Sequence, residues 1–558
     1  MFQSSDANFQ RDRTATGLAH SLVPATPSAY AYPLLIKHLL EAGVVYAPER
    51  EIVYRDVKRQ TYRDLARRVG QLANGLAGLG IEQGDVVAIM DWDSHRYLEG
   101  FFAVPMMGAI LLTVNVRLSP EQIAFTINQA RAKLLLVNSE FLPILSVIKD
   151  RLETVRCYVL ISDRDAPESP VPFVAEYEHL VESSPREHAF ADLDENAPAT
   201  TFFTTGTTGD PKGVYFSHRQ IVLHTFSMIA ALALQSRHGR LDRDDVYMPI
   251  TPMFHSHAWG LPYVATVAGL KQVYPGRYSP DNLLALKKKE GVTISHCVPT
   301  ILQMMLAAPS AKSVDLSGWK ILVGGGAFPV SLAKAALARG IDVFGGYGMS
   351  ETAPVLTISL LKSDVEYQDE AVVRAEPGLP IPFVELRTVD TSGHDSEAPG
   401  EIVVRAPWAT QGYLGNPEAS EALWSGGYLH TGDIGKVDHR GSLHITDRMK
   451  DVIKSGGEWI SSLALENIIL QHPAVAEAAV IGRPDPKWGE RPLAFVVLQQ
   501  DHAETSPDDI HAYILNCAEH GAISKLAVPD QILSVQSLEK TSIGKINKEA
   551  LREKFATG

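Results

Sequence analysis

The sequence predicts an α/β fold: a large N-terminal domain of layered α/β subdomains, a β-rich subdomain and a small C-terminal domain. From about residue 60, helical patterns alternate with short apolar runs that predict buried strands, namely Val86–Met90, Leu134–Val137 and Cys157–Ile161. Such alternation is typical of α/β layering. The chain has 558 residues, more than one hydrophobic core normally fills, so several domains are expected.

After about residue 365 the pattern changes to strands separated by glycine and proline turns. Phe383–Arg387 alternates apolar and polar residues, and the β-rich run Glu401–Arg405 follows. We expect the N-terminal domain to span residues 1–447, a connection to occupy 448–451, and the C-terminal domain to span 452–558. The last stretch is long enough for a small α+β domain.

Composition excludes several classes of function. Hydrophobic residues make up 45% and charged residues 21%, which is ordinary for a globular enzyme. The net charge of −14 argues against nucleic acid or an anionic membrane as the main partner. The longest apolar run, Phe101–Leu112, is too short to span a membrane. The three cysteines lie far apart, so neither a disulfide framework nor a metal cluster is expected, and a cytoplasmic location fits.

The most informative segment is a glycine- and threonine-rich loop that follows an apolar run. Its glycines allow close backbone approach, its hydroxyls donate hydrogen bonds, and successive backbone N–H groups form a concavity that binds anions. The predicted phosphate-binding residues are Thr204, Thr205, Gly206, Thr207, Thr208 and Gly209, with Lys212 as a mobile cation. The spacing differs from the common P-loop pattern. A polar surface turn is the alternative.

Other motifs follow in a fixed order. They are Gly345–Thr352, Tyr428–Asp433, Asp447–Arg448 and Thr541–Lys545. Together with the loop they resemble the acyl-CoA synthetases of the adenylate-forming superfamily, which also includes firefly luciferase and peptide-synthetase adenylation domains. The resemblance covers roughly residues 30–555. It implies an ATP-dependent carboxylic acid–CoA ligase that uses ATP, Mg²⁺ and coenzyme A and has a mobile C-terminal lid.

The chemistry explains the residue types. A carboxylate is a poor acyl electrophile until its attack on the ATP α-phosphate makes an acyl-adenylate, from which a thiol displaces AMP. The first step gathers negative charge, which cations, hydrogen-bond donors and Mg²⁺ offset. The resemblance assigns phosphate and metal contacts to Thr204, Lys212, Glu351 and Thr352, and the bridge between carboxylate and α-phosphate to Lys545. For the nucleotide it implies Gly325, Gly326, Ala327, Gly346, Tyr347, Gly348, Asp433 and Arg448.

Each role has a structural alternative. Tyr347 could be a core aromatic residue, and Glu351 could be a charge at a helix start. Asp433 could be a turn residue, Arg448 could form a surface ion pair, and Lys545 could be solvated.

The resemblance places a hinge at Lys450. The loop containing Gly456 and Gly457 would then line the tunnel for the pantetheine thiol, although a simple hairpin turn is the alternative.

The segment from Met253 to Pro262 would line the acyl pocket, with His255 as its aromatic gate. Amino-acid-activating relatives place an aspartate where this chain has Ser256, so an amino acid substrate is disfavoured.

Trp259, with Gly324 and Gly348, would shape the acid pocket. A bulky indole there favours a medium-chain, alicyclic, aryl or small thioether acid, and the segment looks most like those of medium-chain fatty acid and methylmercaptopropionate ligases. Plain core packing is the alternative for Trp259.

Competing functions are an enzyme that loads a carrier protein, a luciferase-like oxygenase and a nucleotide-binding regulator. The acid, the physiological direction and regulation by lysine acylation stay open, and a homodimer is one state that the resemblance implies.

Overall fold

The computed structural model describes residues 26–164, 169–204, 210–236, 238–362, 365–390, 392–396, 398–455, 458–502, 504–541 and 545–555. The chain divides into two compact units, residues 1–33 and 34–558. In the described part of the first unit, Ala29 N donates to Thr26 O at 2.8 Å and closes a turn. All other elements belong to the second unit.

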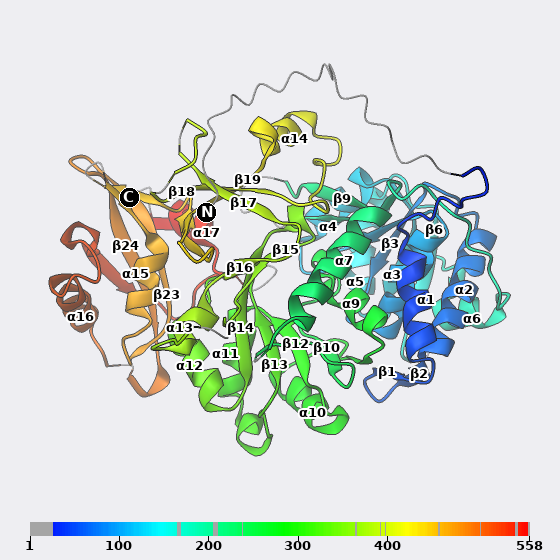
Figure 1. Ribbon diagram of the computed structural model, residues 1–558, viewed down its shortest axis with the longest axis horizontal. Coiled ribbons are helices and arrows are strands. Elements are labelled where there is room, and N and C mark those ends of the chain that lie inside the picture. Colours follow the sequence, from blue (N-terminus) through cyan, green and yellow to red (C-terminus); the bar gives the residue numbers. More distant parts are fainter. Residues whose placement is uncertain are drawn as a thin grey trace. The chain divides into compact units, whose positions relative to one another are not determined.

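A seven-stranded sheet forms the first layer (Figure 1). It is parallel except at β9, which pairs antiparallel with β8. The central strand Val86–Met90 is buried along its whole length, as expected for a parallel strand covered on both faces. In spatial order the strands are β7 (Ala175–Glu176), β6 (Cys157–Ile161), β5 (Ala132–Asn138), β3 (Val86–Met90), β4 (Ile110–Thr113), β8 (Pro198–Phe203) and β9 (Gly213–Ser217).

A nine-stranded sheet forms the second layer. Its central strands are parallel, and its ends, β1–β2 and β14–β15–β16, are antiparallel. In spatial order the strands are β16 (Leu379–Pro380), β15 (Val355–Ile358), β14 (Asp342–Gly348), β13 (Lys320–Val323), β12 (Ile294–Cys297), β10 (Val246–Pro249), β11 (Lys271–Tyr274), β1 (Glu51–Tyr54) and β2 (Lys58–Thr61).

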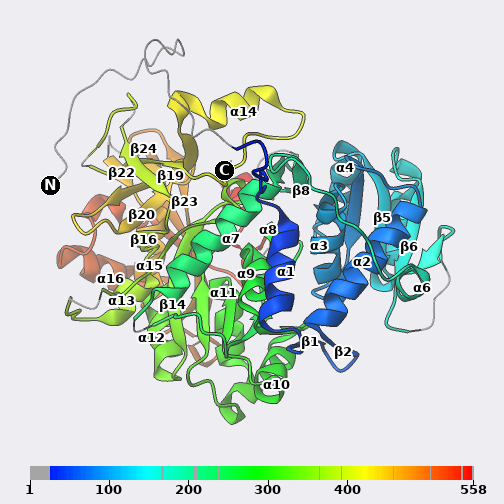
Figure 2. The same cartoon turned by 45° about the vertical axis from the view of Figure 1, so that its right-hand side comes forward.

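Helices α1, α7 and α9 pack together between these sheets (Figure 2). Helix α1 contacts α3 beside the first sheet, whereas α9 contacts β10 and α7 contacts β15 of the second. The helices of this part are α1 (Ile36–Tyr46), α2 (Tyr62–Gly78), α3 (His95–Met106), α4 (Pro120–Gln129), α5 (Leu142–Ile148), α6 (Tyr177–Ser183), α7 (His218–Ala233), α8 (Ser256–Trp259), α9 (Leu261–Ala268), α10 (Pro280–Glu290), α11 (Pro299–Ala307), α12 (Val330–Ala338) and α13 (Glu370–Ala375).

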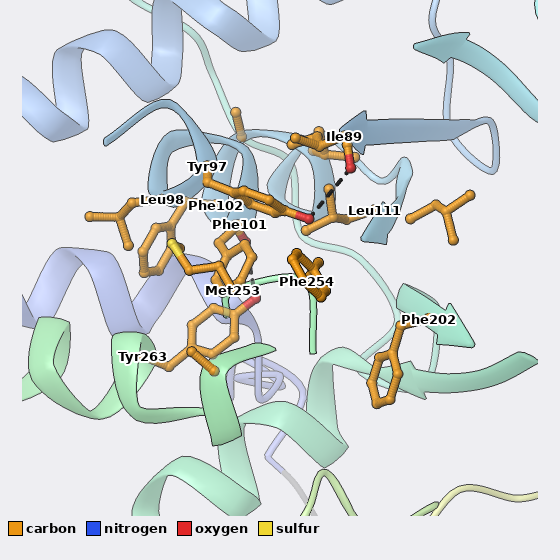
Figure 3. Packing of buried hydrophobic residues seen from close by; sticks show 14 of the residues in the cluster. Ile89, Tyr97, Leu98, Phe101, Phe102, Leu111, Phe202, Met253, Phe254 and Tyr263 are labelled. Atoms are coloured by element: carbon orange, nitrogen blue, oxygen red, sulfur yellow. Dashed lines mark hydrogen bonds between the residues drawn. The ribbon is translucent and has the colours of Figure 1, made fainter. Parts of the chain in front are cut away.

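The core between the first sheet and α9 holds the predicted acyl-pocket segment in place. Met253 and Phe254 are 0% and 2% exposed and pack among the aromatic side chains of α3 and α9 (Figure 3). Thr113 at the end of β4 donates its hydroxyl to Phe254 O at 3.0 Å. The buried carboxylate of Asp93 accepts from Met253 N at 2.7 Å. The backbone directly before His255 is therefore anchored on both sides.

Two antiparallel-rich sheets complete the chain. The first consists of β17 (Glu385–Val389), β18 (Gly400–Arg405), β19 (Leu429–Val437) and β20 (Leu443–Arg448), with α14 (Pro417–Leu423) beside it. The strand predicted from Phe383 begins two residues later, because Phe383 has φ of +70° and cannot continue an extended strand.

The C-terminal sheet comprises β21 (Ile453–Ser455), β22 (Glu458–Ile460), β23 (Val475–Asp485), β24 (Gly489–Leu498) and β25 (Gln531–Ser534), with helices α15 (Ser462–Ile469), α16 (Pro507–Glu519) and α17 (Lys548–Phe555). The fold is thus the predicted large N-terminal region of several sheets followed by a smaller C-terminal region. In the described residues, no helix has both the length and the apolar character needed to cross a membrane.

A buried ion pair joins α2 to α3. Arg68 and Glu99 have side chains that are 3% and 0% exposed and form two hydrogen bonds, of 2.7 and 3.1 Å. Tyr177 donates to the same carboxylate at 2.8 Å. Burial alone would raise the pKa of Glu99, but the adjacent Arg68 keeps that pKa below its ordinary value. The carboxylate is therefore ionised and depends on its partner.

Replacing Arg68 with methionine is expected to lower the free energy of unfolding by roughly 3–5 kcal/mol, because an uncompensated charge stays buried. Arg63→Met on the same helix removes only an exposed pair with Glu49, with side chains 69% and 70% exposed, and is expected to change stability by less than about 1 kcal/mol. Thermal unfolding of both variants makes the comparison. Equal melting temperatures would contradict a structural role for the buried pair.

Candidate active site

The loop predicted to bind phosphate, residues 204–212 (below, the phosphate loop), joins β8 to β9. Thr204 N donates to Lys212 O at 2.8 Å, and Lys212 N donates to the Thr204 hydroxyl at 3.3 Å, so the two ends of the loop are closed on each other. This places Lys212 at the mouth of a hairpin whose strands are fixed by the first sheet. The predicted phosphate contacts Thr205, Gly206, Thr207, Thr208 and Gly209 lie outside the described residues.

Glu351 lies in a 3₁₀ turn, Ser350–Thr352, after β14 and is only 7% exposed. Tyr413 donates its hydroxyl to Glu351 Oε1 at 2.7 Å, and Lys212 Nζ lies 4.9 Å from the centre of the Tyr413 ring. Burial raises the pKa of Glu351, opposed by the Tyr413 hydrogen bond and by the charge of Lys212. The structure thus brings together Lys212 and Glu351, two predicted site residues far apart in sequence.

Thr352 is fully buried, and its hydroxyl is engaged within the same turn. It lies 2.6 Å from Pro354 O and 3.1 Å from Met349 O, and it accepts from Met349 N at 3.2 Å. These bonds order the turn that carries Glu351. A direct contact between this hydroxyl and a phosphate would require it to exchange a backbone partner.

The predicted nucleotide contacts converge from three strands. Tyr347, at the end of β14, donates its hydroxyl to Asp433 Oδ2 at 2.7 Å. Arg448 on β20 is the cross-strand neighbour of Asp433 on β19, and its Nε lies 3.3 Å from Asp433 Oδ1. Burial raises the pKa of Asp433, and the charge of Arg448 opposes that rise.

Glycines beside this site allow segments of backbone to pack closely against one another. A Cβ on Gly348 would lie 1.8 Å from Pro354 O, and one on Gly324 would lie 2.8 Å from Gly346 O. Gly325 has φ of +75°, which only glycine adopts readily. Gly326 and Ala327 follow after β13 and are both exposed, so their backbone is accessible to a bound molecule.

The acyl-pocket segment adopts a left-handed turn that the sequence analysis did not predict. Four consecutive non-glycine residues, Ser256 to Trp259, have φ between +46° and +58°, and Gly260 follows at +75°. Such residues cost about 1–3 kcal/mol each and persist only where their surroundings hold them. The indole of Trp259 lies against His296, with ring centres 5.0 Å apart. It also comes within 3.3 Å of the position a Cβ would take on Gly324.

Lys545 reaches this site from the C-terminal region. Its Cε lies 3.8 Å from the position a Cβ would take on Gly325. Burial and the nearby Arg448 lower the pKa of Lys545 to about 8, opposed by Asp433 and Glu351. Burial, with Lys545 next in effect, lowers the pKa of His255 to about 3, so this imidazole is neutral at physiological pH.

The connection predicted as a hinge is a turn. Asp451 N and Val452 N both donate to Arg448 O, at 2.8 and 3.0 Å, and so close a turn that contains Lys450. Gly456 and Gly457 lie outside the described residues, but the strands that flank them, β21 and β22, pair directly. Their pairing is compatible with the hairpin alternative, and Trp459 on β22 is 54% exposed.

The donor set fits the magnesium ion that the sequence resemblance implies. Mg²⁺ in nucleotide sites is commonly held by one or two carboxylates together with substrate phosphates. Glu351 is a single buried carboxylate close to Lys212, the lysine predicted to bind phosphate. Among the described residues, no group of three or more His, Cys, Asp or Glu side chains could hold a metal by itself.

Two sets of contacts could not be predicted from the sequence. Tyr413 contacts both Lys212 and Glu351, yet it sits in a glycine-rich turn with no pattern of its own. Asp447 accepts hydrogen bonds from the backbone and side chain of Ser462, at 2.6 and 2.7 Å. Both sets of contacts join residues far apart in the chain, so periodicity and local spacing could not have found them.

Comparison with known families gives two matches along the chain. Residues 40–414 match the AMP-binding enzyme family, and residues 464–545 match the AMP-binding enzyme C-terminal domain. A long-chain-fatty-acid–CoA ligase of Thermus thermophilus is 40% identical over 92% of this chain and 94% of its own length. A 3-methylmercaptopropionyl-CoA ligase of Ruegeria lacuscaerulensis is 35% identical over 94% of this chain and 97% of its own.

Solved structures agree with these relatives. The anthranilate CoA ligase AuaEII, in complex with anthranoyl-AMP, has a TM-score of 0.83 and 26% identity, covering 94% of this chain and 98% of its own. The first match spans more than half of the chain, and the relatives align over nearly its whole length. The chain therefore belongs to the AMP-binding enzyme family and is an ATP-dependent, AMP-forming carboxylic acid–CoA ligase.

Proposed function

We propose that this ligase activates a medium-chain, alicyclic, aryl or small thioether acid, with the residues of the candidate site in the roles given below. The reaction has two steps. The acid and ATP form an acyl-adenylate and pyrophosphate, and the acyl-adenylate and CoA then form an acyl-CoA and AMP. The observation that carries the residue roles is the position of Lys545 beside Gly325, near His255, Asp433 and Glu351.

In the first step, a carboxylate oxygen attacks the α-phosphorus and pyrophosphate leaves. Lys545 offsets the charge between the carboxylate and the α-phosphate, while Lys212 binds the β- and γ-phosphates. Asp433 and Arg448 hold the ribose, and Tyr347 stacks on adenine. Mg²⁺ held by Glu351 neutralises phosphate charge when it is bound. The low pKa of His255 supports its role as an uncharged gate.

In the second step, the CoA sulfur attacks the acyl carbon and AMP leaves. Lys545 is then no longer required, and we propose that the domain formed by residues 452–558 rotates about Lys450 to admit the thiol past Gly456 and Gly457. Such a motion can limit turnover. The turn at Arg448–Val452 and the change of sheet after β20 support this boundary.

The acid class rests on Trp259. Its indole lies close to Gly324 and Gly325 and is fixed by the left-handed turn and by His296, which supports a pocket that is short or flat. Relatives act on different acids: one on methylmercaptopropionate, one on long-chain fatty acids. The physiological direction is part of the proposal: by family analogy, abundant AMP and pyrophosphate could drive ATP formation from an acyl-CoA.

A homodimer and a cytoplasmic location extend the proposal on the strength of the family resemblance. Sedimentation velocity and cell fractionation would test them directly. A monomer at micromolar concentration would contradict the homodimer, and recovery with membranes would contradict the cytoplasmic location. Neither outcome would affect the proposed reaction.

A panel of acids identifies the substrate. Pyrophosphate release is measured with medium-chain, long-chain, aryl, alicyclic and thioether acids, each with and without CoA. We expect release to depend on one acid class and to rise with CoA. Pyrophosphate release that does not change with CoA but rises with a phosphopantetheinyl carrier protein would favour the alternative in which the enzyme loads a carrier protein. A preference for long-chain acids would contradict the proposed role of Trp259.

Replacing Lys545 with alanine is expected to lower the adenylation rate by roughly 10²–10³-fold, because one preorganised cation is lost. Conversion of supplied acyl-adenylate to acyl-CoA should be nearly unchanged.

Since burial lowers the pKa of Lys545 to about 8, kcat/KM for ATP in the wild type should fall as pH rises through that value and the ammonium is lost. Lys545→Arg should abolish this decline, and a decline that persists in Lys545→Arg would assign it to another group.

Hydrogen bonds across the proposed hinge are expected to stabilise the domain arrangement used for adenylation, the first step. Asp447 precedes the hinge, whereas Ser462 follows it and also accepts from Lys548 Nζ at 2.7 Å. Ser462→Ala should therefore lower adenylation by up to about tenfold, the effect of one charge-assisted hydrogen bond, and spare thioester formation from supplied acyl-adenylate. Ser506→Ala, which removes a helix cap within the C-terminal region, is the control. Equal loss in both half-reactions would contradict this expectation.

A further inference from the structure

Tyr413 contacts two predicted site residues and has no role assigned so far. It lies outside every motif found in the sequence, between the end of β18 and α14. Its hydroxyl donates to Glu351 at 2.7 Å, and its ring lies 4.9 Å from the Lys212 ammonium. One side chain thus contacts both the proposed metal ligand and the proposed phosphate-binding cation.

We infer that Tyr413 is a positioning residue that orients the Glu351 carboxylate toward Mg²⁺ and holds the Lys212 ammonium over its ring for the phosphates. The inference rests on the proposed roles of Glu351 and Lys212. A single hydroxyl donor engages one carboxylate oxygen and leaves the second outside that bond. Partners of metal-binding carboxylates commonly fix the ligand in this way.

Backbone hydrogen bonds around Tyr413 fix its side chain between Lys212 and Glu351, so that it can keep the two charges apart. Leu414 N donates to Gly213 O at 2.7 Å, directly after Lys212, and Tyr413 forms an antiparallel bridge with Val214. Thr410 N donates to Glu351 O at 2.8 Å. The segment from Thr410 to Leu414 therefore connects the end of the phosphate loop to the turn that carries Glu351, and its position depends on both.

Charge separation supplies the physical reason for such a spacer. A lysine and a glutamate near one another would pair directly, and each would then be less available to a ligand. In the described part of the chain, Lys212 and Glu351 form no direct ion pair; Tyr413 contacts both, with its hydroxyl on Glu351 and its ring under the Lys212 ammonium. A cation–π contact of about 0.5–1 kcal/mol holds the ammonium without neutralising it.

The test uses the full-length protein with a non-hydrolysable ATP analogue, whose affinity is measured by calorimetry with and without Mg²⁺. Tyr413→Phe keeps the ring and loses the hydroxyl. We expect the Mg²⁺ concentration for half-maximal effect to rise by about 10-fold or more, with Mg²⁺-free affinity unchanged. Tyr413→Leu should show the same shift and also bind the analogue about 2–5-fold more weakly without Mg²⁺.

The chain offers a matched control. Tyr428 also donates to a glutamate, Glu385, and carries a cation over its ring, with the Arg405 guanidinium 3.7 Å from the ring centre. Tyr428→Phe should leave the Mg²⁺ dependence unchanged. In a Glu351→Gln background, Tyr413→Phe should add no further loss, because its effect acts through that carboxylate.

An unchanged Mg²⁺ dependence in Tyr413→Phe would overturn the inference, and so would a full additive loss in the Glu351→Gln background. Thermal unfolding of each variant separates these outcomes from misfolding, and Tyr413→Leu provides a second substitution with its own expected pattern. Failure of the unaltered protein to bind the analogue in a Mg²⁺-dependent way would instead contradict the proposed roles of Glu351 and Lys212.

Discussion

Burial of the Glu351 carboxylate is the constraint around which the site is arranged. A carboxylate that is only 7% exposed carries a desolvation cost, which nearby donors and cations must offset. The protein provides a hydroxyl from Tyr413 and charge from Lys212, and Arg448 also favours the ionised form. These groups come from three different regions of the chain. The three regions must therefore fold together before the charge of the buried Glu351 is offset.

The same balance of charge links the C-terminal region to the nucleotide site. Burial and nearby cations lower the pKa of Lys545, whereas Asp433 and Glu351 raise it. Its ammonium is stabilised only where Asp433 and Glu351 are close, so its insertion depends on the residues that would bind nucleotide. When phosphates are consumed or released, the charge around Lys545 changes.

The fold was largely predictable because its signals are local. Val86–Met90 and Cys157–Ile161 form the predicted strands, with the same bounds, because continuous apolar runs must be covered on both faces. The change to a β-rich subdomain and the smaller final region also appear as expected. Phe383 differs, because a left-handed backbone conformation leaves no trace in the alternation of apolar and polar residues.

The chemical class of the reaction could be predicted from the sequence. The glycine- and threonine-rich loop and the motifs that contain Glu351, Asp433 and Lys545 occur in an order that resembles the acyl-CoA synthetases, and the comparisons confirm that family. The tertiary structure alone decided how they meet: the partnership of Tyr413 with Glu351 and Lys212, the bonds between Asp447 and Ser462, and the left-handed turn that aims Trp259. These features arise from contacts between distant segments, whose energies depend on packing rather than on any local pattern.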